Sequence, residues 1–185
     1  MSVTNDARIN NIIERAKNII LKPAAEWDKI AGEAASIKGL YLNYAIILAA
    51  IPAVCSFVGM VLFLHAHLVG ALGAAITTYV MSLAAVGVLG FVVSQLAPKL
   101  QGDGNQEQAF KLAIYSSTPG WIAGVLWILP SLGGLAGLGA LYGLYLFYIG
   151  VPKLAKVPQS NAVIMTVVAL VVTAVVMAVG MALAR

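Results

Sequence analysis

The chain has 185 residues, of which 61% are hydrophobic and only 10% are charged, and its formal net charge is +4. Its mean hydropathy is +0.94. Because a typical soluble domain has about 25% charged residues, this composition excludes an ordinary soluble globular protein. It indicates an integral membrane protein instead.

Five long apolar runs account for the composition, and they cover residues 39–64, 68–96, 109–129, 132–151 and 162–183. Each has about the 20 residues that a helix needs to cross a bilayer. Since lipid cannot satisfy backbone N–H and C=O groups, runs of this length predict α-helices rather than barrel strands. We therefore predict an all-α protein, with an amphipathic interfacial segment over residues 1–38 and a five-helix transmembrane bundle over residues 39–185.

The lysine and arginine positions predict the orientation of this bundle. All but one of the basic residues lie in the N-terminal segment, between the second and third runs, or just before the fifth run: Arg8, Arg15, Lys17, Lys22, Lys29, Lys38, Lys99, Lys111, Lys153 and Lys156. Only Arg185 falls on the other side. The positive-inside rule then predicts a cytoplasmic N-terminus and a C-terminus on the opposite side. The basic excess suits anionic lipid headgroups on the cytoplasmic side and requires no nucleic acid.

The N-terminal segment predicts two short helices that meet at Pro23. Between residues 6 and 21, apolar side chains recur at helical spacing, while Arg15 and Lys17 lie on the opposite face. Such a helix lies flat on a membrane surface. Pro23 suits the first turn of a second helix, and the amphipathic ring of Trp27 suits the headgroup level. Two roles fit these four residues: anchoring the chain to the interface, or docking a cytosolic partner.

The first run contains Pro52, and a short turn with His65 and His67 follows it. Pro52 removes the N–H that would bond to the carbonyl of Leu48, which predicts a kink. Two imidazoles at this spacing bind a transition metal only with further ligands, and no Cys, Asp or Glu is predicted on that side. We therefore interpret the two histidines as an interfacial pair rather than a metal site.

The third run predicts a second kink and a polar pocket. Its centre reads Tyr115, Ser116, Ser117, Thr118 and Pro119, so three hydroxyls lie beside the carbonyl that Pro119 leaves free. With Pro52, these residues form the candidate intramembrane pocket. A kink that only shapes packing is the alternative, because Ser and Thr can satisfy the freed carbonyl without a ligand.

Three G-x-x-x-G pairs predict close helix contacts in the third and fourth runs. They are Gly120 with Gly124, Gly133 with Gly137, and Gly139 with Gly143. Small residues at this spacing let two backbones approach closely. Since only Pro130, Ser131 and a few flanking residues join the two runs, we predict an antiparallel hairpin whose glycine faces pack within the bundle. A homodimer seam is the alternative.

The sequence gives catalysis no support. It contains no nucleophile elbow, P-loop, dinucleotide fingerprint or metalloprotease motif, so we predict neither an enzyme nor a cofactor. The apolar runs also have no Asp, Glu, Lys or Arg at mid-depth, where proton-driven transporters usually place an ionisable group.

Several short motifs resemble one family in their order and spacing across the five runs. They are Leu21-Lys22-Pro23 with Trp27, Tyr115-Ser116-Ser117-Thr118-Pro119, Tyr142, Tyr148-Ile149-Gly150-Val151-Pro152-Lys153-Leu154, and Lys156-Val157-Pro158. This pattern resembles the Ypt-interacting protein (YIP) family, and the compact loops are similar to its bacterial branch.

The resemblance implies a five-span membrane protein with a cytoplasmic N-terminus, and a bacterial inner membrane as its location. Eukaryotic members of the family bind Rab-type small GTPases. This chain departs from them, because its N-terminal segment is short and lacks their acidic, aromatic and Gly-Pro signature. The departure argues against small-GTPase binding here.

Two functions from different classes fit these observations. The first is a non-enzymatic membrane scaffold or adaptor that recruits other membrane or cytosolic proteins. The second is a small-solute or ion conduit, or a lipid-binding protein, that uses the polar pocket at Pro119, since broken helices form sites without charged side chains.

Overall fold

The computed structural model describes the backbone of residues 2–183 and the side chains of residues 9–182. Arg185 therefore lies outside the described residues, as does the side chain of Arg8. Every regular element in the described part is helical. In chain order the elements are α1 (Ser2–Leu21), α2 (Pro23–Gly32), α3 (Ile37–Leu40), η1 (Tyr41–Ala45), α4 (Ile46–Phe63), α5 (Leu68–Leu96), η2 (Ala97–Leu100), α6 (Gln106–Ser116), α7 (Thr118–Ala123), η3 (Gly124–Ile128), η4 (Pro130–Leu135), α8 (Ala136–Leu154) and α9 (Gln159–Leu183). The predicted all-α class is confirmed.

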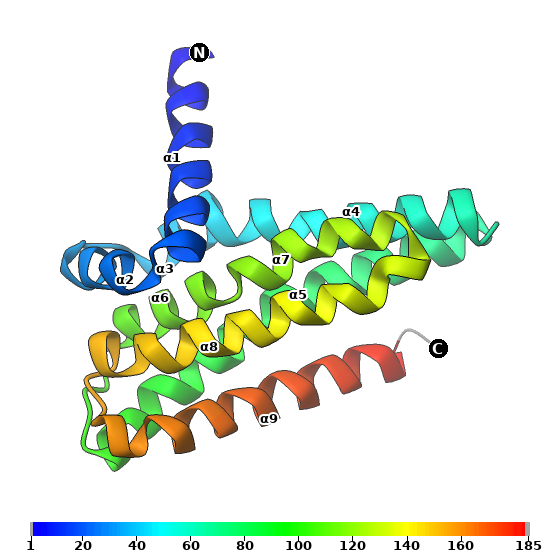
Figure 1. The fold of residues 1–185 in the computed structure, drawn as a ribbon. Coiled ribbons are helices and arrows are strands. Elements are labelled where there is room, and N and C mark those ends of the chain that lie inside the picture. The colour runs from blue at the N-terminus through cyan, green and yellow to red at the C-terminus, as the bar shows by residue number, and fades with distance from the viewer. Residues whose placement is uncertain (1, 184–185) are drawn as a thin grey trace.

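Four helical stretches in the described residues are long and apolar enough to cross a membrane: Ile37–Phe63, Leu68–Leu100, Pro130–Leu154 and Gln159–Ala182. They correspond to the first, second, fourth and fifth predicted runs. Figure 1 shows them side by side, with α5 in contact with α4, α6 and α9, and α8 in contact with α6, α7 and α9. Their outward side chains are large and apolar, as lipid-facing positions require.

The third predicted run is helical but is not one continuous α-helix, and it is interrupted next to Pro119, where a kink was expected. It consists of α6, α7 and the 3-10 helix η3, and Ser117 separates α6 from α7. Pro119 lies in the first turn of α7 and has no N–H to donate to Tyr115, so the α6 hydrogen-bond ladder cannot continue through it. The three pieces nevertheless pass through the bundle, between α4, α5 and α8.

The first run behaves differently at its proline. The helix α4 continues through Pro52, and the irregular part lies earlier, in the π-helical turn η1. The predicted hairpin between the third and fourth runs is confirmed, because η3 and η4 meet at Leu129, which has an extended backbone.

The N-terminal segment is the part that departs most from a simple bundle. As predicted, α1 ends before Pro23, which lies in the first turn of α2. Figure 1 shows α1 running across the direction of the long helices and projecting from their side, as a helix at the membrane surface would. The C-terminal part of α1 docks onto the bundle, where the hydroxyl of Tyr142 donates to the carbonyl of Ile20 over 2.7 Å.

The side chains with least exposure gather at the end of the bundle that α1 and α2 cover. The largest fully buried ones are Trp27, Lys111, Phe147, Ile19, Ile30, Leu112, Ile114, Leu146, Leu154, Met165, Val93 and Val151. They come from α1, α2, α5, α6, α8 and α9. The N-terminal segment is therefore a packed part of the fold and not only an attached anchor.

Candidate functional site

The tryptophan of α2 is a core residue. The sequence placed Trp27 at the headgroup level, whereas the structure buries it completely, with its indole Nε1 donating to the carbonyl of Leu146 over 3.1 Å. A Cβ added at Gly150 would lie 2.8 Å from the Trp27 ring. The glycine thus leaves the space that the indole fills. Trp27 locks α2 onto α8 and cannot itself present a surface to a partner.

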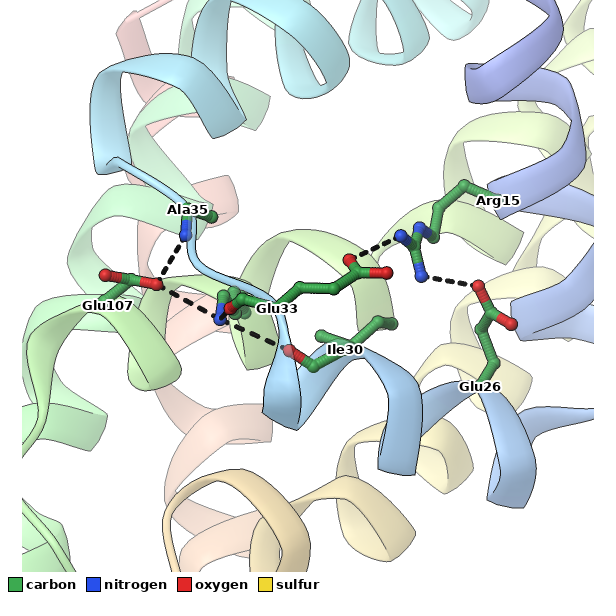
Figure 2. A network of polar contacts seen from close by, with 7 residues as sticks. Arg15, Glu26, Ile30, Glu33, Ala35 and Glu107 are labelled. Carbon is green, nitrogen blue, oxygen red and sulfur yellow. Dashed lines mark hydrogen bonds and ion pairs between the residues drawn. The ribbon is translucent and has the colours of Figure 1, made fainter.

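Arg15 holds α1 to the segment that follows it. Its guanidinium donates to Glu26 and to Glu33, each over 2.5 Å (Figure 2). Burial by itself would lower the pKa of Arg15, but the hydrogen bond to Glu33 and the charges of Glu33 and Glu26 raise it above its ordinary value. The guanidinium also lies 5.6 Å from the ring centroid of Tyr115. Arg15 is therefore a charged clamp between α1, α2 and α6.

Lys111 is the most buried charged residue of the described side chains, with 1% exposure. Its Nζ donates to the carbonyls of Ile30, over 3.2 Å, and of Glu33, and lies 3.1 Å from the Glu107 carboxylate. These carbonyls lie at the end of α2, where a helix leaves C=O groups without intrahelical partners. The cation also suits the negative end of the α2 dipole. Lys111 therefore caps α2 from α6.

Glu107 fixes the loop between α2 and α3. Its Oε1 accepts from the backbone N–H of Ala35 over 2.7 Å, a contact drawn in Figure 2. This hydrogen bond, with the nearby Lys111, lowers the pKa of Glu107, so the carboxylate is charged at neutral pH. Residues of one turn of α6 thus hold both the end of α2 and the loop beyond it.

A polar cleft of about 790 Å³ opens between α1, α2, the 33–36 loop and η1. Its lining is mainly polar or charged: Asn11, Ile12, Glu14, Arg15, Asn18, Glu26, Lys29, Glu33, Ala34, Ala35, Ser36, Gly39, Leu40, Asn43, Tyr44 and Tyr115. The clamp of Arg15, Glu26 and Glu33 forms one wall. Tyr44 packs edge-on against Tyr115, with ring centroids 4.8 Å apart.

A second cavity, of about 360 Å³, lies among α5, α7, α8 and α9. Three of the residues proposed for the intramembrane pocket line it, namely Pro52, Ser116 and Ser117. The other predicted members, Tyr115, Thr118 and Pro119, do not line it. Tyr115 lines the polar cleft, and Thr118 is fully buried, with its hydroxyl 2.9 Å from that of Tyr44. The predicted hydroxyl cluster is thus divided between two faces of the broken third run.

The glycine pairs pack as predicted at some positions only. A Cβ at Gly139 would lie 2.6 Å from the Pro119 carbonyl oxygen, and one at Gly143 would lie 2.6 Å from that of Ser116, so α8 touches the broken run closely. Gly124 packs in the same way against Pro52, and Gly133 against a tryptophan ring. Gly120 has ordinary contacts with α8. Gly137 differs, because a Cβ there meets no atom within 4 Å.

The remaining candidates lie at the surface. His65 and His67 are exposed in the turn between α4 and α5, and His65 adopts a φ of 51°. Within the described residues, no three His, Cys, Asp or Glu side chains come close enough together to hold a metal. Lys17 is exposed on α1.

Sequence reasoning missed the clamp and the cap, namely Glu26, Glu33, Glu107 and Lys111. One signal was available, since Glu107 and Lys111 stand four residues apart at the start of an apolar run, which is the spacing of a helical ion pair. No local pattern signals that Arg15 meets Glu26 and Glu33. That contact depends on the turn at Pro23, which folds α2 back against α1.

Comparison with known proteins agrees with this architecture. Residues 17–181 match the Yip1 domain. No matching curated protein and no matching solved structure was found. The match begins within α1, after Arg15, and continues into α9, so it includes Glu26 and Glu33 of the clamp, the cap, and the cavity among α5, α7, α8 and α9. With four apolar helices able to span a bilayer, this chain is a helical membrane protein that belongs to the Yip1 domain family.

Proposed function

We propose that this protein is a non-enzymatic membrane scaffold or adaptor that recruits a partner protein through the polar cleft. The cleft itself is the observation that carries the proposal. Trp27 and Lys111 hold its walls from behind, and Arg15 braces them within the lining, so its shape is present before any partner binds. A preformed surface avoids part of the entropy cost of ordering on binding.

The charge of the cleft favours a basic partner segment. Three carboxylates line it, from Glu14, Glu26 and Glu33, against two basic groups, from Arg15 and Lys29. Because the carboxylates outnumber the basic groups, the lining has a net negative charge. Arg15 is moreover shared between two of these carboxylates, Glu26 and Glu33. Complementary charge steers association and selects partners.

The lysine and arginine distribution supports a cytoplasmic N-terminus and a C-terminus on the opposite side of the membrane. The compact loops, similar to those of the bacterial branch of the family, favour a bacterial inner membrane. Because residues 11–44 contribute nearly all of the cleft, it then faces the cytoplasm. Anionic lipid headgroups on the same side would contact the surrounding lysines.

The conduit hypothesis has less support. The hydroxyls of Ser116 and Ser117 both donate to the carbonyl of Ala113, over 3.2 and 2.8 Å, and Thr118 bonds to Tyr44. The hydroxyl protons of Ser116 and Ser117 are therefore engaged within the protein, so these groups cannot donate to an anion or a polar solute.

Photo-crosslinking in the native membrane tests the adaptor proposal. A photoreactive residue replaces Asn18 or Lys29, which line the cleft, and in a matched control it replaces Lys99, an exposed residue outside it. We expect Asn18 and Lys29 to capture the same protein, identified by mass spectrometry, and Lys99 not to capture it.

The added substitution Glu14→Lys, on the exposed face of α1, is expected to reduce that capture because it reverses one charge of the lining. Capture of lipid alone at both cleft positions would contradict the proposal. So would an identical set of proteins at the cleft and at Lys99.

A further inference from the structure

The cavity among α5, α7, α8 and α9 opens sideways, toward the lipid. The rim includes Gly137, Ala140 and Leu141 of α8 and Leu170 of α9, all of them exposed. Trp121, with 5% exposure, lies deeper. A molecule in the bilayer can therefore enter between two spanning helices.

Most polar groups of the lining already have partners. The indole of Trp121 donates to the hydroxyl of Ser82 over 2.7 Å, and the hydroxyl of Thr173 donates to the carbonyl of Ala169 over 2.8 Å. Ser116 and Ser117 both bond to Ala113. Thr78 adds a hydroxyl on an exposed part of α5. The surface offered to an occupant is mostly apolar, so a hydrated solute would lose hydrogen bonds without replacement.

The size of the cavity decides between apolar occupants. One turn of an α-helix about 10 Å in diameter fills about 420 Å³. The cavity has a volume of about 360 Å³, of the order of one such turn. A partner helix that crosses the membrane has about 20 residues, so it cannot lie inside the cavity. An unbranched hydrocarbon chain is narrower and is also the solvent that surrounds α8 and α9 in the membrane.

We propose that this cavity binds the acyl chain of a membrane lipid, which enters between α8 and α9 and reaches Trp121. This site is separate from the polar cleft and does not depend on the adaptor function. The acyl chain would fill the cavity and so give the side chains that line it the van der Waals contacts that an empty space lacks.

Quenching of Trp121 fluorescence by brominated lipid tests the proposal, because bromine quenches tryptophan on contact. The full-length Trp127→Phe variant is reconstituted in phosphatidylcholine vesicles, with or without bromine at the middle of the acyl chains. Trp127 is removed because it is 43% exposed and lipid could quench it directly. Trp27 is kept because it is fully buried on α2. We expect strong quenching in brominated vesicles, and its loss when Trp121→Phe is added.

Two further variants, also made in the Trp127→Phe protein, locate the quenching. Gly137→Leu fills the mouth of the cavity, and Gly73→Leu is its matched control on α5, since neither added Cβ meets an atom within 4 Å and Gly73 does not line the cavity. Circular dichroism checks that both remain folded. We expect Gly137→Leu to lose most of the quenching and Gly73→Leu to retain it. Equal quenching in both, or none in the parent, would overturn the proposal.

Discussion

Lys111 holds together the end of the bundle that α1 and α2 cover. It is 1% exposed, and its ammonium group contacts two backbone carbonyls of the α2 end and the Glu107 carboxylate. Gln108, on the same helix, donates to the carbonyl of Ala31 over 3.0 Å. Buried charge is costly unless it is paired and hydrogen-bonded, and here both conditions hold.

Replacement of this lysine should therefore destabilise the protein strongly. Lys111→Met keeps much of the side-chain volume but leaves three acceptors without their cation, which should cost about 3 kcal/mol. Thermal unfolding in detergent, followed by circular dichroism, measures the effect. The matched control is Lys99→Met at an exposed position, which should change the unfolding temperature little. Equal unfolding temperatures for the two variants would contradict the capping role.

At the scale of elements, α8 packs closely against the broken third run because the contact positions on α8 are glycines, which have no side chain. The space beside Pro119 and Ser116 is taken by the backbone of α8, because Gly139 and Gly143 have no Cβ. Gly137, on the same helix, faces open space. Three glycines of one helix thus have two different roles, which their common spacing does not reveal.

This difference gives a matched pair of substitutions. Gly139→Ala puts a methyl group 2.4 Å from the Ala123 Cβ, which should cost about 1–3 kcal/mol through overpacking. Gly137→Ala places the same methyl group in open space and should be neutral or slightly stabilising, since alanine favours a helix over glycine. Unfolding temperatures of the two variants in one detergent provide the comparison. A larger loss of stability for Gly137→Ala would contradict the close packing of α8 at Gly139.

At the scale of the whole molecule, the N-terminal segment and the bundle form one packed unit. The helix α2 meets α8 through Trp27, and an ion pair between Asp28 and Lys153 joins the same two helices at the surface. The elements that line the cleft, α1, α2 and η1, lie toward the same end of the bundle as the 97–106 connection (Figure 1).

Orientation in the membrane can be measured with single cysteines. In a Cys55→Ala background, His67→Cys and Lys99→Cys place a thiol at opposite ends of α5, both at exposed positions. A membrane-impermeant maleimide applied to intact cells, with the outer membrane permeabilised, should label His67→Cys at once. Lys99→Cys should react only after the inner membrane is opened. The reverse pattern would show that the positive-inside reading of this chain is wrong.

Local sequence patterns were sufficient for much of the fold. The all-α class, the break before Pro23 and the hairpin at Pro130 and Ser131 were all predicted correctly. These features depend on neighbouring residues only, since a lipid-exposed backbone must form its own hydrogen bonds and proline lacks an N–H. The same argument underestimated Pro119, which ends one helix and starts another rather than bending a single one.

The sequence by itself determined which segments are helical and lipid-exposed, because hydrophobic length and backbone hydrogen bonding are properties of each segment alone. Only the tertiary structure decided what the polar side chains do. It buried Trp27, paired Arg15 with two carboxylates, and divided Tyr115 and Ser117 between a polar cleft and an apolar cavity. Burial and pairing are set by segments distant in the chain, which no local pattern contains.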